Sequence, residues 1–105
     1  MRIAVTYANE DIFQHFGHTE QFKVYDVENG AVVASQVIDT NGSGHGALAG
    51  VLAALNADVL ICGGIGGGAQ MALAAAGIKL YGGVSGNADA AVAAFLDGKL
   101  DFNPN

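Results

Sequence analysis

The sequence predicts an α/β domain in which helices cover both faces of one mixed β-sheet. In the second half of the chain, short apolar runs alternate with alanine-rich segments, which is the pattern of parallel β-α-β units. In the first half, Asn29-Gly30 separates two strand-like runs, and Asn-Gly is a strong hairpin signal. The chain has 105 residues, 51% of them hydrophobic, so we expect one core and a single domain over residues 1–105.

Three strands are predicted in the first half of the chain. Residues 1–7 form a short apolar, β-branched run that is typical of a buried strand. Residues 21–27 alternate between polar and apolar side chains, as a half-exposed strand does. The Asn-Gly turn then leads into an antiparallel strand over residues 31–38. Residues 8–20 are mostly polar and contain glycine, which indicates a long loop after the first strand.

The second half of the chain is predicted to alternate between helices and strands. We expect helices over residues 47–55 and 69–76 and a last helix that ends at about Leu96, with strands over residues 58–62 and 78–81 between them. Each helix follows a glycine-rich loop, and these loops cover residues 40–46, 63–68 and 82–87. Gly77 stands where a helix C-terminal glycine belongs.

The expected sheet has five strands in the order 3-2-1-4-5, with strand 2 antiparallel. The chain directions then bring every long loop to one edge of the sheet and leave only tight connections at the other edge. Open α/β sheets bind ligands at such an edge, at the point where the strand order reverses. Here that point lies between strands 1 and 4, beside the loops 8–20 and 63–68.

The glycine-rich loops suggest a site for an anion. Free N–H groups at helix N-termini attract negative charge, so we interpret the loops 42–46, 63–68 and 82–87 as an anion cradle. The glycines expected to approach a cofactor are Gly17, Gly44, Gly46, Gly64, Gly66 and Gly67. In the alternative interpretation, the glycines only allow tight turns between strands and helices. A dinucleotide site is disfavoured, because no acidic residue ends the next strand to hold a ribose.

Three histidines and the single cysteine are the candidate metal ligands. His15 and His18 lie three residues apart in the first long loop, His45 lies in the next one, and Cys62 ends the fourth strand. Neutral imidazole binds iron, zinc and copper alike, and a thiolate would add a soft ligand. Taken one at a time, a loop histidine is more often a solvated residue, and a cysteine that ends an apolar strand is more often a small core residue.

Composition excludes several classes of function. Four basic residues stand against ten acidic ones, and there is no Trp, so we expect no nucleic-acid partner. No apolar run is long enough for a membrane span, and the start of the chain is too short for a signal peptide. A lone thiol fits the reducing cytoplasm. The central strands carry no carboxylates for metal-assisted hydrolysis except Asp58 at the far end of its strand, so we expect no enzyme.

The motifs together resemble a known family, the proteins of dinitrogenase iron–molybdenum cofactor biosynthesis. This family includes NifX-like and NifY-like proteins and the C-terminal domain of NifB. The resemblance runs from residue 1 to about residue 100. It rests on His15-Phe16-Gly17-His18 with the preceding Ile12-Phe13-Gln14, on Phe22, and on the segments Gly44-His45-Gly46, Gly63-Gly64-Ile65-Gly66 and Ala76-Gly77-Ile78.

The resemblance implies a ribonuclease H-like fold without nuclease activity and a role in binding and passing on a metal–sulfur cofactor or its precursor. It points to His15 as the first ligand, with His18, His45 and Cys62 as further ones. Our first hypothesis is therefore a non-enzymatic carrier of an iron–molybdenum cofactor or a related cluster, served by donor and acceptor proteins. The alternatives are a small-anion or nucleotide-binding regulatory module and, third, an enzyme with one metal ion on His15 and His18.

Overall fold

A mixed β-sheet runs through the centre of the molecule, and the computed structural model describes residues 1–41 and 45–103 of the chain. The strands are β1 (Arg2–Ala8), β2 (Asp11–Ile12), β3 (Gln21–Glu28), β4 (Ala31–Asp39), β5 (Val59–Ile61) and β6 (Lys79–Tyr81). The helices are α1 (His45–Ala54), α2 (Gly67–Ala75) and α3 (Ala88–Leu96), with a 3-10 helix, η1, over Phe16–His18. The sheet has the order β4-β3-β1-β5-β6, and β2 pairs with β1.

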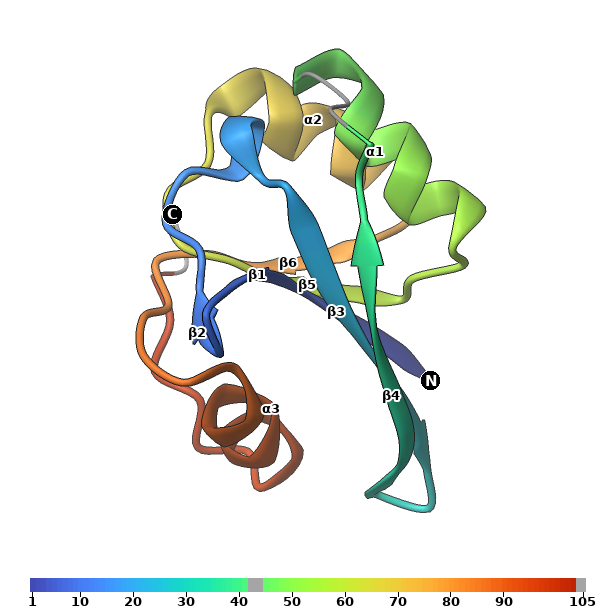
Figure 1. Ribbon diagram of the computed structural model, residues 1–105, viewed down its shortest axis with the longest axis vertical. Coiled ribbons are helices and arrows are strands. Elements are labelled where there is room, and N and C mark those ends of the chain that lie inside the picture. Colours follow the sequence, from blue (N-terminus) through green and yellow to red (C-terminus); the bar gives the residue numbers. More distant parts are fainter. Residues whose placement is uncertain (42–44, 104–105) are drawn as a thin grey trace.

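The order and directions of the strands confirm the predicted topology. The five strands expected from the sequence are β1, β3, β4, β5 and β6, and they lie in the 3-2-1-4-5 order. β3 is antiparallel to both β1 and β4, whereas β1, β5 and β6 are parallel. Figure 1 shows α1 and α2 on one face of the sheet and α3 on the other, which gives the three predicted layers.

A sixth, short strand lies within the segment predicted to be loop. β2 pairs with the end of β1 through Tyr7 and Ile12 and through Ala8 and Asp11. The turn between them consists of Asn9 and Glu10, which both have positive φ, at 50° and 72°. Hairpin turns of this kind are usually Asn-Gly, because glycine takes positive φ without strain. Because Glu10 stands where glycine is usual, the sequence carries no recognisable signal for this hairpin.

Helices α1 and α2 each begin two residues earlier than predicted, at His45 and Gly67. The first N–H groups of a helix make no intrahelical hydrogen bonds, so the boundary between loop and helix is not marked in the sequence, and residues counted as loop belong to the first turn. Gly44, one of the predicted cofactor-binding residues, lies outside the described residues, and His45 and Gly46 are described only as the first residues of α1. Within the described ranges, no helix is long and apolar enough to cross a membrane.

Side chains that alternate along the central strands build two apolar layers. On the α3 side, Ile3 and Val5 of β1 pack with Ile61 of β5 against α3. On the other side, Ala4 and Leu60 pack against α1 and α2, together with further buried residues that include Phe16, Phe22, Leu48, Leu52, Cys62 and Leu73. The central strands β1 and β5 are thus covered on both faces, as the β-α-β half of the sheet requires, whereas the edge strand β4 is mostly exposed.

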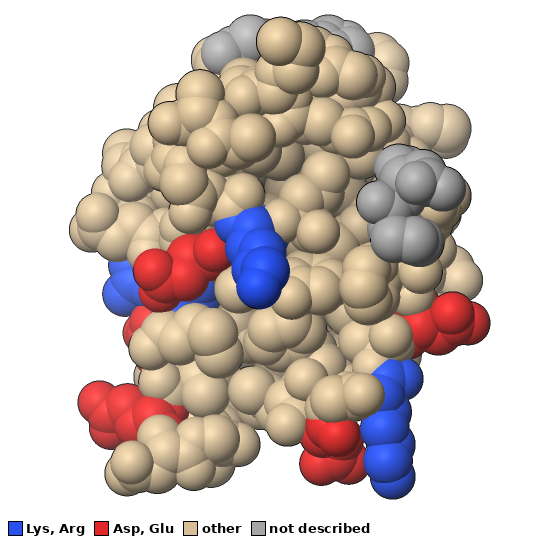
Figure 2. All heavy atoms as spheres, turned by 180° about the vertical axis from the view of Figure 1, so that it is seen from behind, with Lys and Arg blue, Asp and Glu red and all other residues tan. Residues whose placement is uncertain are grey.

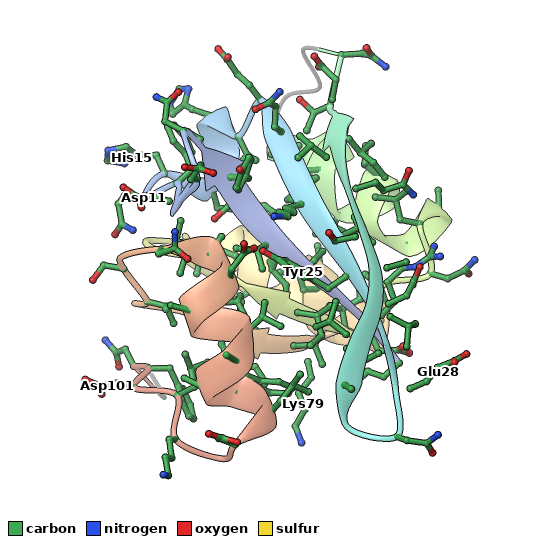
Figure 3. All side chains as sticks on the ribbon, turned by 60° about the horizontal axis from the view of Figure 1, so that its bottom comes forward. Asp11, His15, Tyr25, Glu28, Lys79 and Asp101 are labelled. Carbon is green, nitrogen blue, oxygen red and sulfur yellow. The ribbon has the colours of Figure 1, made fainter. Side chains whose placement is uncertain are left out.

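Helix α3 is tied to the sheet by one polar cluster as well as by its apolar face. Asp89 accepts hydrogen bonds from Lys23 Nζ at 2.8 Å and from the Tyr25 hydroxyl at 2.5 Å. Figure 3 shows Tyr25 between the sheet and this helix. The bond from Lys23 lowers the pKa of Asp89, and burial raises the pKa of Tyr25. The cluster therefore holds Asp89 ionised and Tyr25 neutral at neutral pH.

Candidate ligand-binding site

A pocket of about 530 Å³ opens between the loop that follows β2 and the start of α2. It lies beyond the carboxyl ends of β1 and β5, the neighbouring parallel strands at the predicted switch point. Figure 1 shows η1 (blue) beside the start of α2 (yellow) at this edge. The first wall consists of His15, Phe16, Gly17 and His18, and the second of Gly64, Ile65, Gly66, Gly68, Ala69 and Ala72.

The main chain on both sides of His15 is fixed to the loop after β5. Gly64 donates its N–H to Gln14 O at 2.8 Å, and Phe16 donates its N–H to Gly64 O at 3.1 Å. His15 thus pairs with Gly64 like a residue of a parallel strand. A Cβ on Gly64 would lie 3.0 Å from Gln14 O, closer than nearly all real Cβ contacts, so glycine allows this approach. The two hydrogen bonds place the His15 backbone at the mouth of the pocket.

The side chains in this turn alternate between the core and the solvent. Phe16 is only 2% exposed and belongs to the apolar layer under α1 and α2, whereas His15 and His18 are exposed. His18 donates its main-chain N–H to His15 O at 2.9 Å, and Thr19 closes the turn by donating its hydroxyl to Phe16 O at 2.7 Å. The buried ring anchors the turn, so both imidazoles lie on its exposed side.

The His15 ring is itself oriented by an aromatic contact. Its centroid lies 6.0 Å from that of Phe13, with the ring planes at 77°, which is an edge-to-face arrangement. Figure 3 shows His15 pointing outward at the edge of the molecule, away from the sheet. The imidazole is therefore held on one side and open on the other.

The opposite wall of the pocket is an uncapped helix N-terminus made of glycine. Gly66 is the N-cap of α2, and no side chain caps this end. A Cβ on Gly66, Gly67 or Gly68 would meet no atom within 4 Å, so packing does not require glycine there. The first N–H groups of a helix have no intrahelical acceptor and carry partial positive charge. Bare main chain at this point lets an anion approach these N–H groups closely.

The structure brings together some of the predicted site residues and separates others. His15, Gly17, His18, Gly64 and Gly66 line the pocket, and Gly67 stands in the first turn of α2. In the described part of the chain, no group of three or more His, Cys, Asp and Glu is placed to hold a metal ion. The two histidines alone therefore leave most of a metal's coordination to its other ligands.

Cys62 does not reach the pocket. Its side chain is 0% exposed and packs in the apolar layer under α1 and α2. Burial raises the pKa of its thiol from the ordinary 9.0 to about 12, so the thiol is neutral at physiological pH. Because metals bind the thiolate, this position counts against the sequence-based expectation that Cys62 is a ligand.

The loop over residues 82–87 also lies elsewhere than the predicted cradle. Gly83 donates its N–H to Gly63 O at 2.9 Å and Val84 donates to Cys62 O at 3.0 Å, so its main chain is used to extend the sheet edge. Gly82 and Gly83 line a smaller hollow of about 210 Å³ on the other side of the β5–α2 loop. Within the described residues, the start of α2 is therefore the part of the predicted cradle that lines the pocket, and most of the 42–46 loop lies outside them.

The structural roles of several residues at the site are not evident from the sequence alone. Ile65, Ala69 and Ala72 form the apolar part of the pocket wall, yet in the sequence they read as ordinary core or helix residues. Phe13 and Gln14 support His15 from outside the pocket, Phe13 through its ring contact with His15 and Gln14 through its hydrogen bond to Val84, which is distant along the chain. Only the tertiary structure identifies them.

The pocket lies at the switch point of the strand order, and exposed imidazoles and a bare helix N-terminus face it. These features define the chain as a small ligand-binding α/β domain. The chain belongs to the dinitrogenase iron-molybdenum cofactor family, whose model matches residues 1–98. The family predicted from the sequence motifs is thereby confirmed.

Three relatives illustrate the similarity. The uncharacterised protein MJ0580 of Methanocaldococcus jannaschii is 29% identical over 107 residues, which cover 96% of this chain and 90% of that protein. The crystal structure of PH0822 has a TM-score of 0.93 and 27% identity, covering 100% of this chain and 96% of the other. The apo form of the orange protein from Desulfovibrio gigas has a TM-score of 0.85 and 33% identity, covering 99% and 93%.

Proposed function

We propose that the protein binds an anionic metal–sulfur cofactor in this pocket and holds it for transfer, without changing it chemically. One observation carries the proposal: two exposed imidazoles, from His15 and His18, face an uncapped helix N-terminus with no side chains across a pocket of about 530 Å³. The family to which the chain belongs supports an iron–molybdenum cofactor or a related iron–sulfur or molybdenum–sulfide cluster as the cargo.

The chemistry of the two walls suits such a cluster. Its sulfides carry negative charge and accept hydrogen bonds, so the N–H groups at the start of α2 stabilise it without a lysine or arginine. An imidazole supplies one exchangeable ligand to a metal. Ile65, Ala69 and Ala72 offer an apolar surface to the soft sulfides. One or two protein ligands bind reversibly, which suits transfer better than closure by four thiolates.

The same residues favour a carrier over an enzyme. Among the described residues, those that line the pocket include no carboxylate, lysine, serine or cysteine, and their polar side chains are the two imidazoles. A general acid–base pair or a nucleophile with its base needs such groups within hydrogen-bond reach. We therefore propose cluster-donating and cluster-accepting proteins as the partners and the cytoplasm as the location.

The test is an anaerobic titration of metal-free protein with tetrathiomolybdate, followed by visible absorbance and native mass spectrometry. Stoichiometric uptake is expected for the wild type. His15→Ala should weaken it about tenfold or more, the equivalent of about 1.4 kcal/mol for a lost ligand, with an unchanged melting temperature. Gln36→Ala, at an exposed residue of β4 away from the pocket, is the control. Equal affinity of His15→Ala and wild type would remove His15 from the site.

A second candidate function is a regulatory module that binds a small oxyanion or a nucleotide phosphate. The observation in its favour is that no side chain caps the N-terminus of α2, so its free N–H groups are of the kind that binds phosphate, independently of the histidines. This function predicts that phosphate or a mononucleotide raises the melting temperature in the presence of a chelator, with the same shift in His15→Ala. The absence of a shift by either ligand, together with uptake of tetrathiomolybdate, would leave the carrier function alone.

A further inference from the structure

We infer that Gln14 is a positioning residue for His15: its side-chain amide ties the loop that carries His15 to the β6–α3 loop and so directs the imidazole to the ligand. The inference rests on the proposed function only in that His15 is the residue presented. The contacts that carry it are independent of any bound group.

The Gln14 amide joins two segments that are far apart in the sequence. Its Nε2 donates to Ile12 O and to Val84 O, each at 3.0 Å. Both acceptors are main-chain carbonyls, so the nitrogen, and not the amide oxygen, must face them. The first bond closes the turn directly before His15, and the second crosses to the loop that precedes α3.

Gln14 can occupy its position only because residue 63 is glycine. A Cβ on Gly63 would lie 2.6 Å from Gln14 Oε1 and 2.7 Å from Gln14 Cα, distances that real Cβ atoms essentially never show. The Gln14 side chain and backbone therefore lie directly against the Gly63 main chain. Gly63 is held in turn by Gly83, whose N–H donates to its carbonyl at 2.9 Å. Gln14 thus packs against the main chain just after β5.

These contacts act on His15 from its N-terminal side, while the core holds the C-terminal side. The next residue, Phe16, is anchored by its buried ring, so that end of the turn stays in place when Gln14 changes. The exposed His15 ring has Phe13 as its aromatic neighbour, and Phe13 lies in the segment that the Gln14 amide closes. Loss of the amide should therefore disturb the imidazole direction more than the stability of the fold.

The decisive experiment is a double-mutant cycle with tetrathiomolybdate as the probe. Gln14→Met keeps the length of the side chain and removes both donors. It should weaken binding about three- to tenfold in the wild-type background, as for one or two lost hydrogen bonds, and less than about twofold in the His15→Ala background. Equal weakening in both backgrounds would overturn the inference, because a residue with a merely structural role does not depend on His15.

Gln70→Met is the matched control. Gln70 also donates its amide Nε2 to a main-chain carbonyl beside the pocket, that of Ile65 at 3.2 Å, but this bond joins two residues of the β5–α2 segment and not the turn with His15. Its effect should be the same in the wild-type and His15→Ala backgrounds. If Gln14→Met does not fold, Gln14→Asn, which keeps the amide but is one methylene shorter, takes its place in the cycle.

A measurement without ligand separates this inference from the proposed function. In the metal-free protein, nuclear Overhauser contacts between the Phe13 and His15 rings should be strong in the wild type and in Gln70→Met and weakened in Gln14→Met. Unchanged ring contacts and unchanged His15 chemical shifts in Gln14→Met would overturn the positioning role. Failure of the wild type to take up tetrathiomolybdate would count against the proposed function only, because the ring contacts still decide the role of Gln14.

Discussion

Cys62 ends the apolar run of β5 with its thiol inside the layer under α1 and α2, where none of it is exposed. Two residues further on, Gly64 forms the pocket wall. His15 and Phe16 differ in the same way, since one ring is exposed at the pocket and the next is buried in the core. At this scale, function depends on which side of the main chain a residue faces, and neighbours in sequence have opposite roles.

The buried thiol predicts a pH effect on stability. Its pKa is raised to about 12 in the folded protein, whereas in the unfolded chain the thiol ionises near pH 9. Above pH 9 the unfolded state therefore loses this proton first, and the free energy of unfolding falls as the pH rises. The loss attributable to Cys62 should reach about 1.4 kcal/mol by pH 10.

Urea unfolding at several values between pH 8 and pH 10 tests this effect, with Cys62→Ala as the comparison. The substitution removes the titrating group, so the variant should lose less stability over this interval than the wild type, although it is less stable throughout because of the smaller core side chain. Parallel pH profiles of the two proteins would contradict the assigned burial. In the native state the thiol should also resist alkylation at neutral pH.

Helices α1 and α2 have similar composition, yet their glycines have different roles. Gly50 stands on the exposed face of α1, and Gly68 stands in the first turn of α2 at the pocket. A Cβ at either position would meet no atom within 4 Å. The pair therefore allows one substitution, glycine to alanine, to be compared at a pocket-lining and at a remote helix position.

Alanine at either position should leave the fold intact. In the interior of α1, Gly50→Ala should raise the free energy of unfolding by about 0.5–1 kcal/mol, because alanine loses less backbone entropy in a helix. Gly68→Ala should have a smaller effect on stability but should weaken tetrathiomolybdate uptake, because its methyl group enters the pocket. Equal uptake by the two variants would show that the bare main chain of α2 does not contact the ligand.

On the scale of the whole molecule, the charged residues lie outside helices α1 and α2, with Arg2 reaching only the carbonyl of Leu55 just after α1. Neither helix contains a Lys, Arg, Asp or Glu, although the chain has a net charge of −6. Figure 2 shows the same pattern from behind: the upper part of the molecule, where these helices lie, carries no blue or red residue, and the charges lie in the middle and lower parts. An anion that approaches the pocket thus meets repulsion at long range and N–H groups at contact.

This arrangement predicts that salt accelerates the capture of an anionic ligand. Tetrathiomolybdate is a dianion and the protein is acidic, so raising the ionic strength from about 20 mM to about 200 mM should screen the repulsion and increase the association rate about two- to threefold. Stopped-flow absorbance at one fixed, mildly alkaline pH measures this rate. A rate that falls with salt would indicate that the local field of α2 and the imidazoles outweighs the net charge.

Much of the fold was predictable because it follows from local chemistry. Apolar runs of strand length, the Asn29-Gly30 turn and the alanine-rich segments define five strands and three helices, and connection rules leave few ways to order them. The β1–β2 hairpin was not predictable, because its turn places Glu10 at a positive φ that local propensity disfavours. The HFGH motif predicted the family and one wall of the site.

The sequence by itself determined the layers, the strand order, the edge at which the pocket lies and the presence of two imidazoles there. Only the tertiary structure decided which predicted ligands meet. In the folded chain Cys62 is buried, and the 82–87 loop extends the sheet edge. Gln14 packs against Gly63. The physical reason is that periodicity and turn chemistry act over a few residues. These contacts, in contrast, join segments up to 70 residues apart, and their distances are set by how the sheet and helices pack.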